Sequence, residues 1–110
     1  MLARIRHGWT TTENATPYEQ LLREEIFAGI LARGIPGFRE IALLRRPLGA
    51  EVEFVTIMWF TSLEAVVAFA GTDHEVAVVP PPARALLARF DERSAHYEVV
   101  EQRTPPAVEP

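Results

Sequence analysis

Three histidines are the side chains best suited to acid–base chemistry in this 110-residue chain: His7, His74 and His96. An imidazole exchanges a proton near neutral pH, so each could act as a general base or acid. Aromatic rings could hold a planar, apolar substrate beside such a base by stacking and hydrogen bonding. The candidates for that role are Trp9, Tyr18, Trp59 and Tyr97. The chain therefore has the parts of a proton-transfer site for a ring-shaped substrate.

Several other chemistries are excluded or unsupported by the sequence. The chain has no cysteine, which excludes disulfides, thiolate nucleophiles and Cys-ligated metal sites. The three histidines form no i, i+4 pair and no His-x-Glu spacing on a helix, so we predict no metal site. The sequence lacks G-x-S-x-G and a glycine-rich phosphate loop, and Ser62 and Ser94 fall at capping or turn positions. We therefore do not expect a hydrolase.

The first histidine alternates with a tryptophan along a predicted strand over residues 2–9. Both side chains, His7 and Trp9, then lie on one face, while Arg4 and Arg6 lie on the other. The pair could form a base beside an aromatic wall. Alternatively, the histidine lies near solvent at the strand end and the tryptophan lies in the core.

The other candidates also have two interpretations each. His74 falls in an irregular stretch, 72–82, and could reach over a pocket or be solvated. His96 and Tyr97 must point to opposite faces of a last strand over residues 95–101, and the sequence leaves open which one faces the helices. Tyr18 and Trp59 could line the same cavity or belong to the core, and Trp59 ends a central strand where a pocket beneath the helices would open.

The strand over residues 51–60 is the element around which the others are arranged. It is rich in β-branched and aromatic residues and is apolar on both faces. One face carries Val52, Phe54, Met58 and Phe60, and the other carries Val55, Ile57 and Trp59. The following Thr61-x-x-Glu64 is a capping box, which predicts a helix over residues 62–70.

The remaining elements follow from periodicity and from capping signals. Thr16 as N-cap, Pro17 at the first helical position and Gly34 past the end predict a helix over residues 17–33. We further expect a strand over 38–46, a hairpin connection over 47–50, a short helix over about 82–90 and a proline-rich tail over 104–110.

This order of elements is the split βαβ arrangement of an α+β, ferredoxin-like domain over residues 1–103. Its two main helices cover one face of a four-stranded antiparallel sheet. One apolar face of strand 51–60 would then remain in water, at a cost of roughly 1.5–3 kcal/mol for each large side chain. We therefore predict a homodimer whose two sheets pack face to face about a twofold axis.

Composition limits the partners and the compartment. Hydrophobic residues make up 48% of the chain and charged residues 24%, which is typical of a globular domain. The formal net charge of −4 gives no electrostatic case for nucleic acid or an anionic membrane surface. All 11 basic residues are arginines dispersed along the chain, which we interpret as a coding bias. No apolar run resembles a signal peptide or membrane span, so we expect a cytoplasmic location.

Three stretches stand out together: residues 3–9 (ARIRHGW), residues 55–65 (VTIMWFTSLEA) leading to Phe69, and residues 94–99 (SAHYEV). In this combination the chain resembles the antibiotic-biosynthesis-monooxygenase group of the dimeric α/β-barrel superfamily. The resemblance spans residues 1–101. It implies a ferredoxin-like subunit that pairs through its sheet to form a dimeric α/β barrel.

The resemblance also implies a reaction. Members of the group include oxygenases without a cofactor, which convert phenols of the anthrone or hydroquinone type into quinones, and haem-degrading monooxygenases. Haem degraders use an Asn on the first strand, a Trp near the end of the second helix and a His about ten residues later. The corresponding places here hold His7 or a neighbour, Phe69 and about Val79, which argues against haem oxygenation.

Our leading hypothesis is thus a homodimeric oxygenase that uses O₂ and no cofactor on an aromatic or polyketide-type phenol. His7, His74 and either His96 or Tyr97 would handle protons, while Trp9 and Trp59 would form walls. One alternative is a non-catalytic dimer that binds a small hydrophobic ligand or has a structural role. Another is an isomerase or cyclase on the same scaffold.

Overall fold

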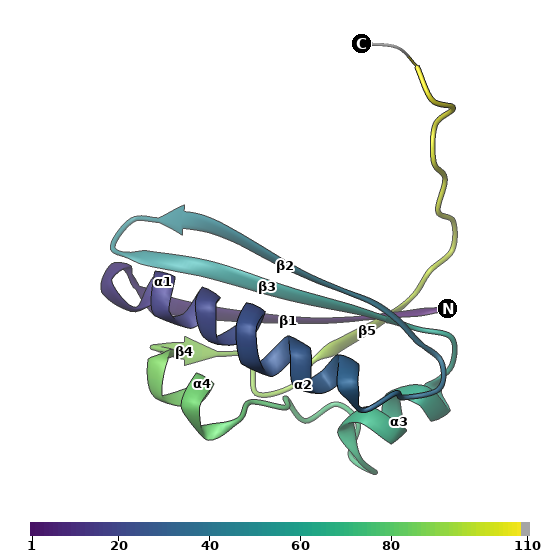
Figure 1. Cartoon of the computed structure of the whole chain (residues 1–110), viewed down its shortest axis with the longest axis horizontal. Helices are drawn as coiled ribbons and strands as arrows, with labels where there is room; N and C mark the ends of the chain where they lie inside the picture. Colours follow the sequence, from purple (N-terminus) through teal and green to yellow (C-terminus); the bar gives the residue numbers. More distant parts are fainter. Residues whose placement is uncertain (109–110) are drawn as a thin grey trace.

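A long antiparallel sheet, covered on one side by helices, makes up most of the chain in a computed structural model that describes residues 1–108 (Figure 1). The elements in order are β1 (Leu2–Thr11), α1 (Thr12–Leu21), the π-helical turn η1 (Leu22–Ile26), α2 (Phe27–Ala32), β2 (Phe38–Leu48), β3 (Glu51–Phe60), α3 (Leu63–Ala70), α4 (Pro81–Leu86), β4 (Arg89–Phe90) and β5 (Ala95–Glu98). Residues 109 and 110 of the predicted tail lie outside the described residues.

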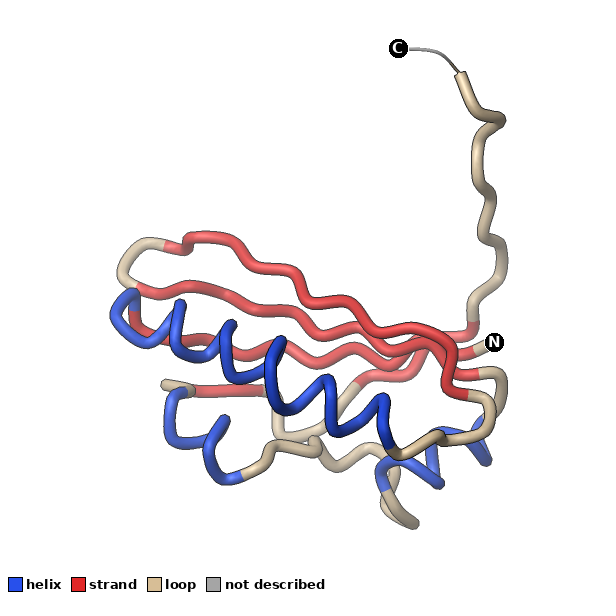
Figure 2. The backbone as a smooth tube through the Cα atoms, in the orientation of Figure 1, coloured by secondary structure: helices blue, strands red, loops and turns tan. Residues whose placement is uncertain are grey.

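The sheet has the strand order β2-β3-β1-β4, and β5 also pairs with β1. All pairings are antiparallel, and the helices lie together on one side (Figure 2). The predicted α+β, ferredoxin-like fold is therefore confirmed. The fourth strand position differs from the prediction, because two short strands share it: β4 pairs with Gly8 and Trp9, and β5 pairs with residues 2–5.

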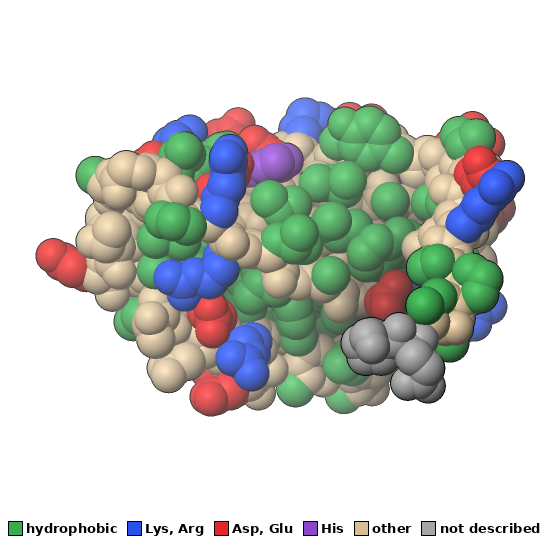
Figure 3. Space-filling view, turned by 90° about the horizontal axis from the view of Figure 1, so that it is seen from above, with side chains coloured by type: hydrophobic (Ala, Val, Ile, Leu, Met, Phe, Trp, Pro, Cys, Tyr) green, Lys and Arg blue, Asp and Glu red, His purple; other side chains and the backbone are tan. Residues whose placement is uncertain are grey.

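The pairing of β1 with β3 decides which apolar face of β3 the helices cover. Val52, Phe54, Met58 and Phe60 are at most 5% exposed and belong to the two clusters of the core beneath the helices. The alternate residues Val55, Ile57 and Trp59 are only partly buried and lie on the other side, which we call the open face. Hydrophobic side chains gather over the middle of that face (Figure 3).

The first helix begins earlier than its sequence signals predicted. The N-cap is Thr11, whose side chain accepts a hydrogen bond from the backbone N–H of Asn14, and not Thr16. Pro17 consequently lies inside α1, beyond the first turn, where the helix lacks the hydrogen bond that an N–H would donate to the carbonyl of Glu13. The helical path continues through η1 and α2, and Gly34 follows with φ +59° as the expected left-handed residue.

Two later helices also differ in detail. The N-cap of α3 is Ser62, whose Oγ accepts from the N–H of Ala65, and not Thr61. The predicted helix over 82–90 ends at Leu86, and Leu87 is extended. The physical reason is pairing with the sheet edge, since the N–H of Ala88 donates to the carbonyl of Trp9 at 2.7 Å. The last strand ends at Glu98 rather than at residue 101.

Candidate functional site

A cavity lies between the sheet and the helical layer. Together with the solvent at its open mouth it contains about 460 Å³ of space free of protein atoms, and its enclosed inner part is much smaller. That inner space is enough for a few waters. The wall is apolar, and the polar groups come from the strands and one turn. The lining residues are Arg4, Arg6, Leu22, Ile26, Phe27, Ile30, Ile41, Thr56, Met58, Phe69, Val78 and Ser94.

The floor of the cavity carries Arg4, which is 4% exposed. One of its terminal nitrogens donates to the carbonyl of His74 and to Nε2 of His96, the latter at 2.9 Å. The other donates to the carbonyl of Val76 at 3.0 Å. Burial, with a smaller effect from the nearby charge of Arg6, lowers the pKa of Arg4 to about 10. Arg4 is thus a cation with three protein partners, none of which is an acid.

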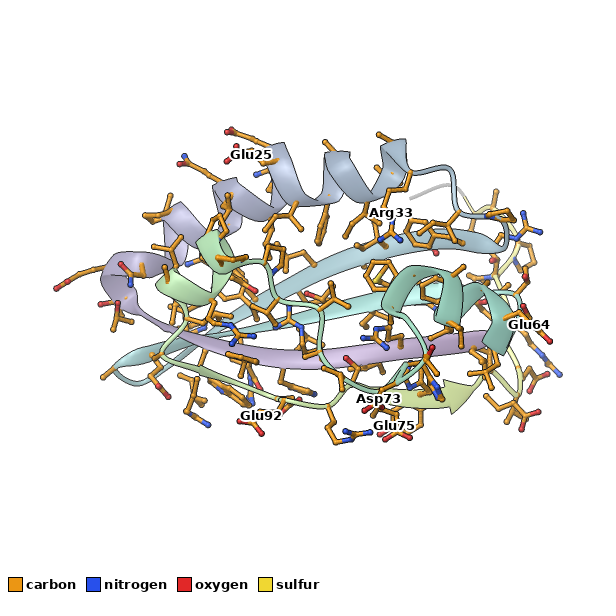
Figure 4. All side chains as sticks on the ribbon, turned by 90° about the horizontal axis from the view of Figure 1, so that it is seen from below. Glu25, Arg33, Glu64, Asp73, Glu75 and Glu92 are labelled. Atoms are coloured by element: carbon orange, nitrogen blue, oxygen red, sulfur yellow. The ribbon has the colours of Figure 1, made fainter. Side chains whose placement is uncertain are left out.

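Arg6 lies two residues further along the same face of β1. Among residues 1–108, neither Arg4 nor Arg6 forms an ion pair. The carbonyls that bind Arg4 belong to the segment after α3, and the acidic residues of that segment pair with another arginine. Asp73 and Glu75 pair with Arg93 at 3.0 and 3.4 Å and lie at the outer edge (Figure 4). The cavity therefore has two positive charges and no carboxylate among its lining residues.

A second polar group in the wall is unpartnered. Ser94 is 4% exposed, and its Oγ has no hydrogen-bond partner among the described residues. Ser94 lines the same cavity as the two arginines. An unsatisfied buried hydroxyl costs free energy, so a group that it can bind would be stabilising there.

Two aromatic and helical features shape the wall. Phe69 lies between two guanidinium groups, with Arg4 at 5.5 Å and Arg33 at 5.4 Å from its ring centre. Arg33 also reaches from the end of α2 to the carbonyl of Ala68 at 3.1 Å, which fixes α3 against α2 (Figure 4). On the opposite wall, Leu22 and Ile26 come from the π-helical turn η1. Such turns within α-helices occur frequently at functional sites.

His74 and His96 are brought together on the helix side of the sheet. Their ring centres are 5.3 Å apart, although 21 residues separate them in the sequence. Because arginine only donates, Nε2 of His96 must accept from Arg4, so the imidazole is neutral with its proton on Nδ1. Burial, then the charges of Arg4 and His74, lower the pKa of His96. Neither ring is among the residues that line the cavity, but the ring of His96 adjoins it through Arg4, whereas His74 contacts Arg4 through its carbonyl.

His7, Trp9, Trp59 and Tyr97 lie on the open face instead, as the pairing of their strands shows. The rings of His7 and Trp9 are stacked at 6.0 Å, and Nδ1 of His7 lies 3.2 Å from Glu53. Hydrogen bonds from Arg46, then from His7, lower the pKa of the Glu53 carboxyl. Trp59, for which the sequence left cavity and core open, thus does not border the cavity beneath the helices. The open question on the last strand is decided: His96 faces the helices and Tyr97 does not.

Tyr18 belongs to the core, as one of its two interpretations predicted. It is fully buried and packs edge-on against Phe54 at 4.9 Å between ring centres. Sequence reasoning missed Arg4 and Arg6, which it attributed to coding bias. The available signal was their alternation along the strand. If the helices cover the face that carries two arginines, those side chains must either reach solvent at the edge of the core or bind a partner within it.

Two further observations concern other kinds of site. Within residues 1–108, no three His, Asp or Glu side chains are grouped so as to hold a metal ion. Over the same range, the helices are too short or too polar for any of them to cross a membrane.

No protein-family model matches the chain, and no curated protein sequence matches it significantly. Solved structures do match it over nearly its whole length. A proposed antibiotic biosynthesis monooxygenase from Bacillus cereus has a TM-score of 0.69 at 16% identity, over 97% of this chain and 98% of its own. SnoaB, a cofactor-independent oxygenase from Streptomyces nogalater, has a TM-score of 0.55 at 23% identity, over 96% and 98%.

A third structure is that of MhuD, a haem degrader from Mycobacterium tuberculosis with two haems in its active site. It has a TM-score of 0.58 at 20% identity, over 94% of this chain and all of its own. At these identities the likeness shows a common fold. The chain thus has the fold of antibiotic-biosynthesis-monooxygenase-type proteins.

Proposed function

We propose that the chain is an oxygenase of the antibiotic-biosynthesis-monooxygenase group that oxidises an aromatic or polyketide-type phenol with O₂ and without a cofactor. The observation that carries the proposal is the apolar cavity beneath the helices, with Arg4 and Arg6 in its floor and a neutral His96 next to Arg4. SnoaB, a cofactor-independent oxygenase, has the same fold. The cytoplasmic location expected from the sequence stays a prediction.

The reaction makes few demands on the protein. For an anthrone, loss of one C–H proton gives an electron-rich anion, which transfers electrons to O₂ and forms a C–O bond. Loss of the second C–H proton and cleavage of the O–O bond then release water, so that anthrone and O₂ give anthraquinone and one H₂O. The carbon centre is oxidised and O₂ is reduced. The cavity needs only to accept the ring, remove a proton and limit access of water.

We assign the proton transfers to His96, with the His74 ring beside it, since His96 adjoins the cavity through Arg4 and its lowered pKa keeps it neutral at neutral pH. A neutral imidazole can accept a proton, whereas an imidazolium cannot, and Nε2 of His96 becomes free to do so when Arg4 turns from it to a bound anion. His7 and Tyr97, which the sequence also predicts as site residues, are not part of the cavity proposed here. Because they lie on the other face of the sheet, His7 provides a comparison for variants of His96.

The open face supports the predicted homodimer. Its middle is apolar, with Ile5, Val55, Ile57 and Trp59 partly exposed and Leu44 48% exposed. Charged groups such as Glu53 and Arg46 pair at its margin. A second copy related by a twofold axis would present the same surface, so that apolar meets apolar. We propose that two sheets pack in this way and close a dimeric α/β barrel.

A second candidate function is binding of a hydrophobic ligand without turnover. It is favoured by one observation, namely that no histidine is among the residues that line the cavity. Binding needs only the apolar wall and the arginines, whereas oxidation also needs a proton acceptor within reach of the ring.

The two candidates differ in an assay with dithranol, which is 1,8-dihydroxyanthrone. Protein and dithranol are mixed under air, and formation of the anthraquinone is followed by absorbance. An oxygenase accelerates quinone formation over buffer, and His96→Ala slows it while His7→Ala does not. If the protein binds dithranol but gives no acceleration, binding without turnover is the function. If His96→Ala and His7→Ala leave the acceleration equally unchanged, the assigned proton acceptor is wrong.

A further inference from the structure

We infer that the cavity beneath the helices is a site for an amphipathic anion, in which an apolar ring carries one anionic oxygen group held between Arg4 and Arg6. This inference rests on the proposed function, because it names the substrate class of the same cavity. The chemical class is an aromatic acid or an ionised phenol.

The charge of the cavity carries the first step. Its lining includes two guanidinium groups and no carboxylate, and Arg4 is 4% exposed. A cation that is removed from water without a counter-ion costs free energy, and proteins almost always pair it. Asp73 and Glu75 could have supplied the counter-ion from the covering segment, but both pair with Arg93. An anionic ligand would restore the balance of charge.

The hydrogen-bond donors carry the second step. Arginine has five N–H groups, and the contacts of Arg4 with His74, Val76 and His96 use three of them. The hydroxyl of Ser94 has no partner among residues 1–108, and no hydrogen bond of the Arg6 side chain is found there either. These free donors line one cavity, so an oxygen anion would find several partners at once.

The remaining wall matches the apolar part of such a ligand in its chemistry. Phe27, Phe69, Met58 and the aliphatic residues of η1 and α2 surround the polar floor. Polar groups at one end and apolar groups elsewhere are the usual pattern of a small-molecule site. The ligand would thus point its charged end to β1 and its ring to the helices.

A purely structural role explains only part of this arrangement. Arg4 could serve to hold the carbonyls of His74 and Val76, and so fix the segment that follows α3. That role gives no reason for Arg6 in the same cavity or for the unpartnered hydroxyl of Ser94. An anion that binds between them accounts for all three residues.

The inference has a chemical consequence for the proposed reaction. Positive charge next to a phenol favours its ionised form, so the arginines would lower the pKa of a bound substrate. The ionised form is the one that can reduce O₂. Arg4 and Arg6 would then contribute to proton removal by stabilising its product.

The test uses two probes of equal shape, 2-naphthoate and 2-naphthylmethanol, of which only the first is an anion at pH 7.5. Their affinities for the full chain are measured by calorimetry or fluorescence. We expect 2-naphthoate to bind at least about tenfold more tightly, as a charge-assisted hydrogen bond provides. The main variant is Arg6→Met, because Arg6 holds no other part of the protein and its loss should spare the fold. Arg39→Met removes an exposed arginine outside the cavity and is the matched control for net charge.

Loss of the preference for 2-naphthoate in Arg6→Met, with retention in Arg39→Met, would support the inference. Equal affinity for the two probes in the unaltered protein would overturn it, as would equal weakening by both variants or no binding of either probe. Dithranol oxidation is measured on the same samples. If the protein prefers the anion but does not oxidise dithranol, the inference stands and the oxygenase proposal is rejected. If it oxidises dithranol but shows no preference for the anion, the oxygenase proposal stands and the inference is rejected.

Discussion

A terminal nitrogen of Arg4 lies 2.9 Å from Nε2 of His96, where the first and last strands of the sheet are paired. The contact joins the floor of the cavity to the histidine pair and requires a neutral imidazole as acceptor. Protonation of His96 would turn this hydrogen bond into a contact between two cations. The stability of the fold and the state of the cavity are therefore linked to one proton.

The first prediction concerns pH. The pKa of His96 lies below its ordinary value of 6.5 in the folded chain, so between the two pKa values the unfolded chain binds more protons. Stability should fall as pH drops below 6.5, until the folded pKa is passed. Urea midpoints measured from pH 7.5 to 5.5 should show the decline. His74 and Glu75 also face His96, and only Glu75 opposes the shift.

The decline should be absent from His96→Gln and retained in His7→Gln, whose ring is on the other face. Titration of Glu19 and Glu53 does not contribute to the decline in stability over this pH range. Hydrogen bonds to arginines lower the pKa of both carboxyls below 4.5, so their contribution is present above that pH and is lost only below the range used. An identical pH profile for all three proteins would contradict the prediction.

The second prediction compares the two unpartnered hydroxyls. Ser94→Ala and Thr10→Val each remove a buried hydroxyl without a partner, so each should leave the free energy of unfolding unchanged or raise it by up to about 1 kcal/mol. Only Ser94 lines the cavity. Ser94→Ala should therefore lower the affinity for 2-naphthoate about tenfold, and Thr10→Val should leave that affinity unchanged. Equal affinities would show that Ser94 makes no contact with the anion.

The third prediction concerns the open face. Ile57→Asp places a charge in the middle of its apolar patch and should convert a dimer into a monomer, as measured by light scattering at micromolar concentration. Leu31→Asp is the matched control, since Leu31 is 59% exposed on the helix side. Circular dichroism verifies that both variants are folded. A monomer mass for the unaltered chain would contradict the proposed homodimer.

The fourth prediction concerns the turn that places α3 next to β2. Gly37 has φ +86°, and a Cβ there would lie 2.5 Å from the hydroxyl of Thr61 and 2.8 Å from the Cβ of Ala65. Gly37→Ala should destabilise the fold by about 2 kcal/mol or more in urea unfolding. Gly34→Ala, with φ +59° and open space around it, should cost only about 1 kcal/mol. Similar losses of stability in the two variants would show that Thr61 and Ala65 move aside to accommodate a Cβ at residue 37.

Local patterns predicted most of the fold. The β-branched and aromatic residues of 51–60 and the helical spacing after residue 17 predicted the element types, and the order of elements predicted the ferredoxin-like sheet. The predicted ends of the helices and strands differ from the observed ones because neighbouring residues can serve the same capping or pairing role. Thr11 and Ser62 cap their helices although Thr16 and Thr61 have the same chemistry, and Leu87 left its helix because a sheet edge was available.

By itself, the sequence determined that β3 is apolar on both faces and that the chain has three histidines and no cysteine. It could not say which face the helices cover, because that depends on the register between β1 and β3. The tertiary structure placed His7, Trp9 and Trp59 on the open face and gathered Arg4, Arg6, His74 and His96 on the other. Residues up to 92 positions apart meet there. Such contacts are set by packing of the whole sheet, and no local pattern carries them.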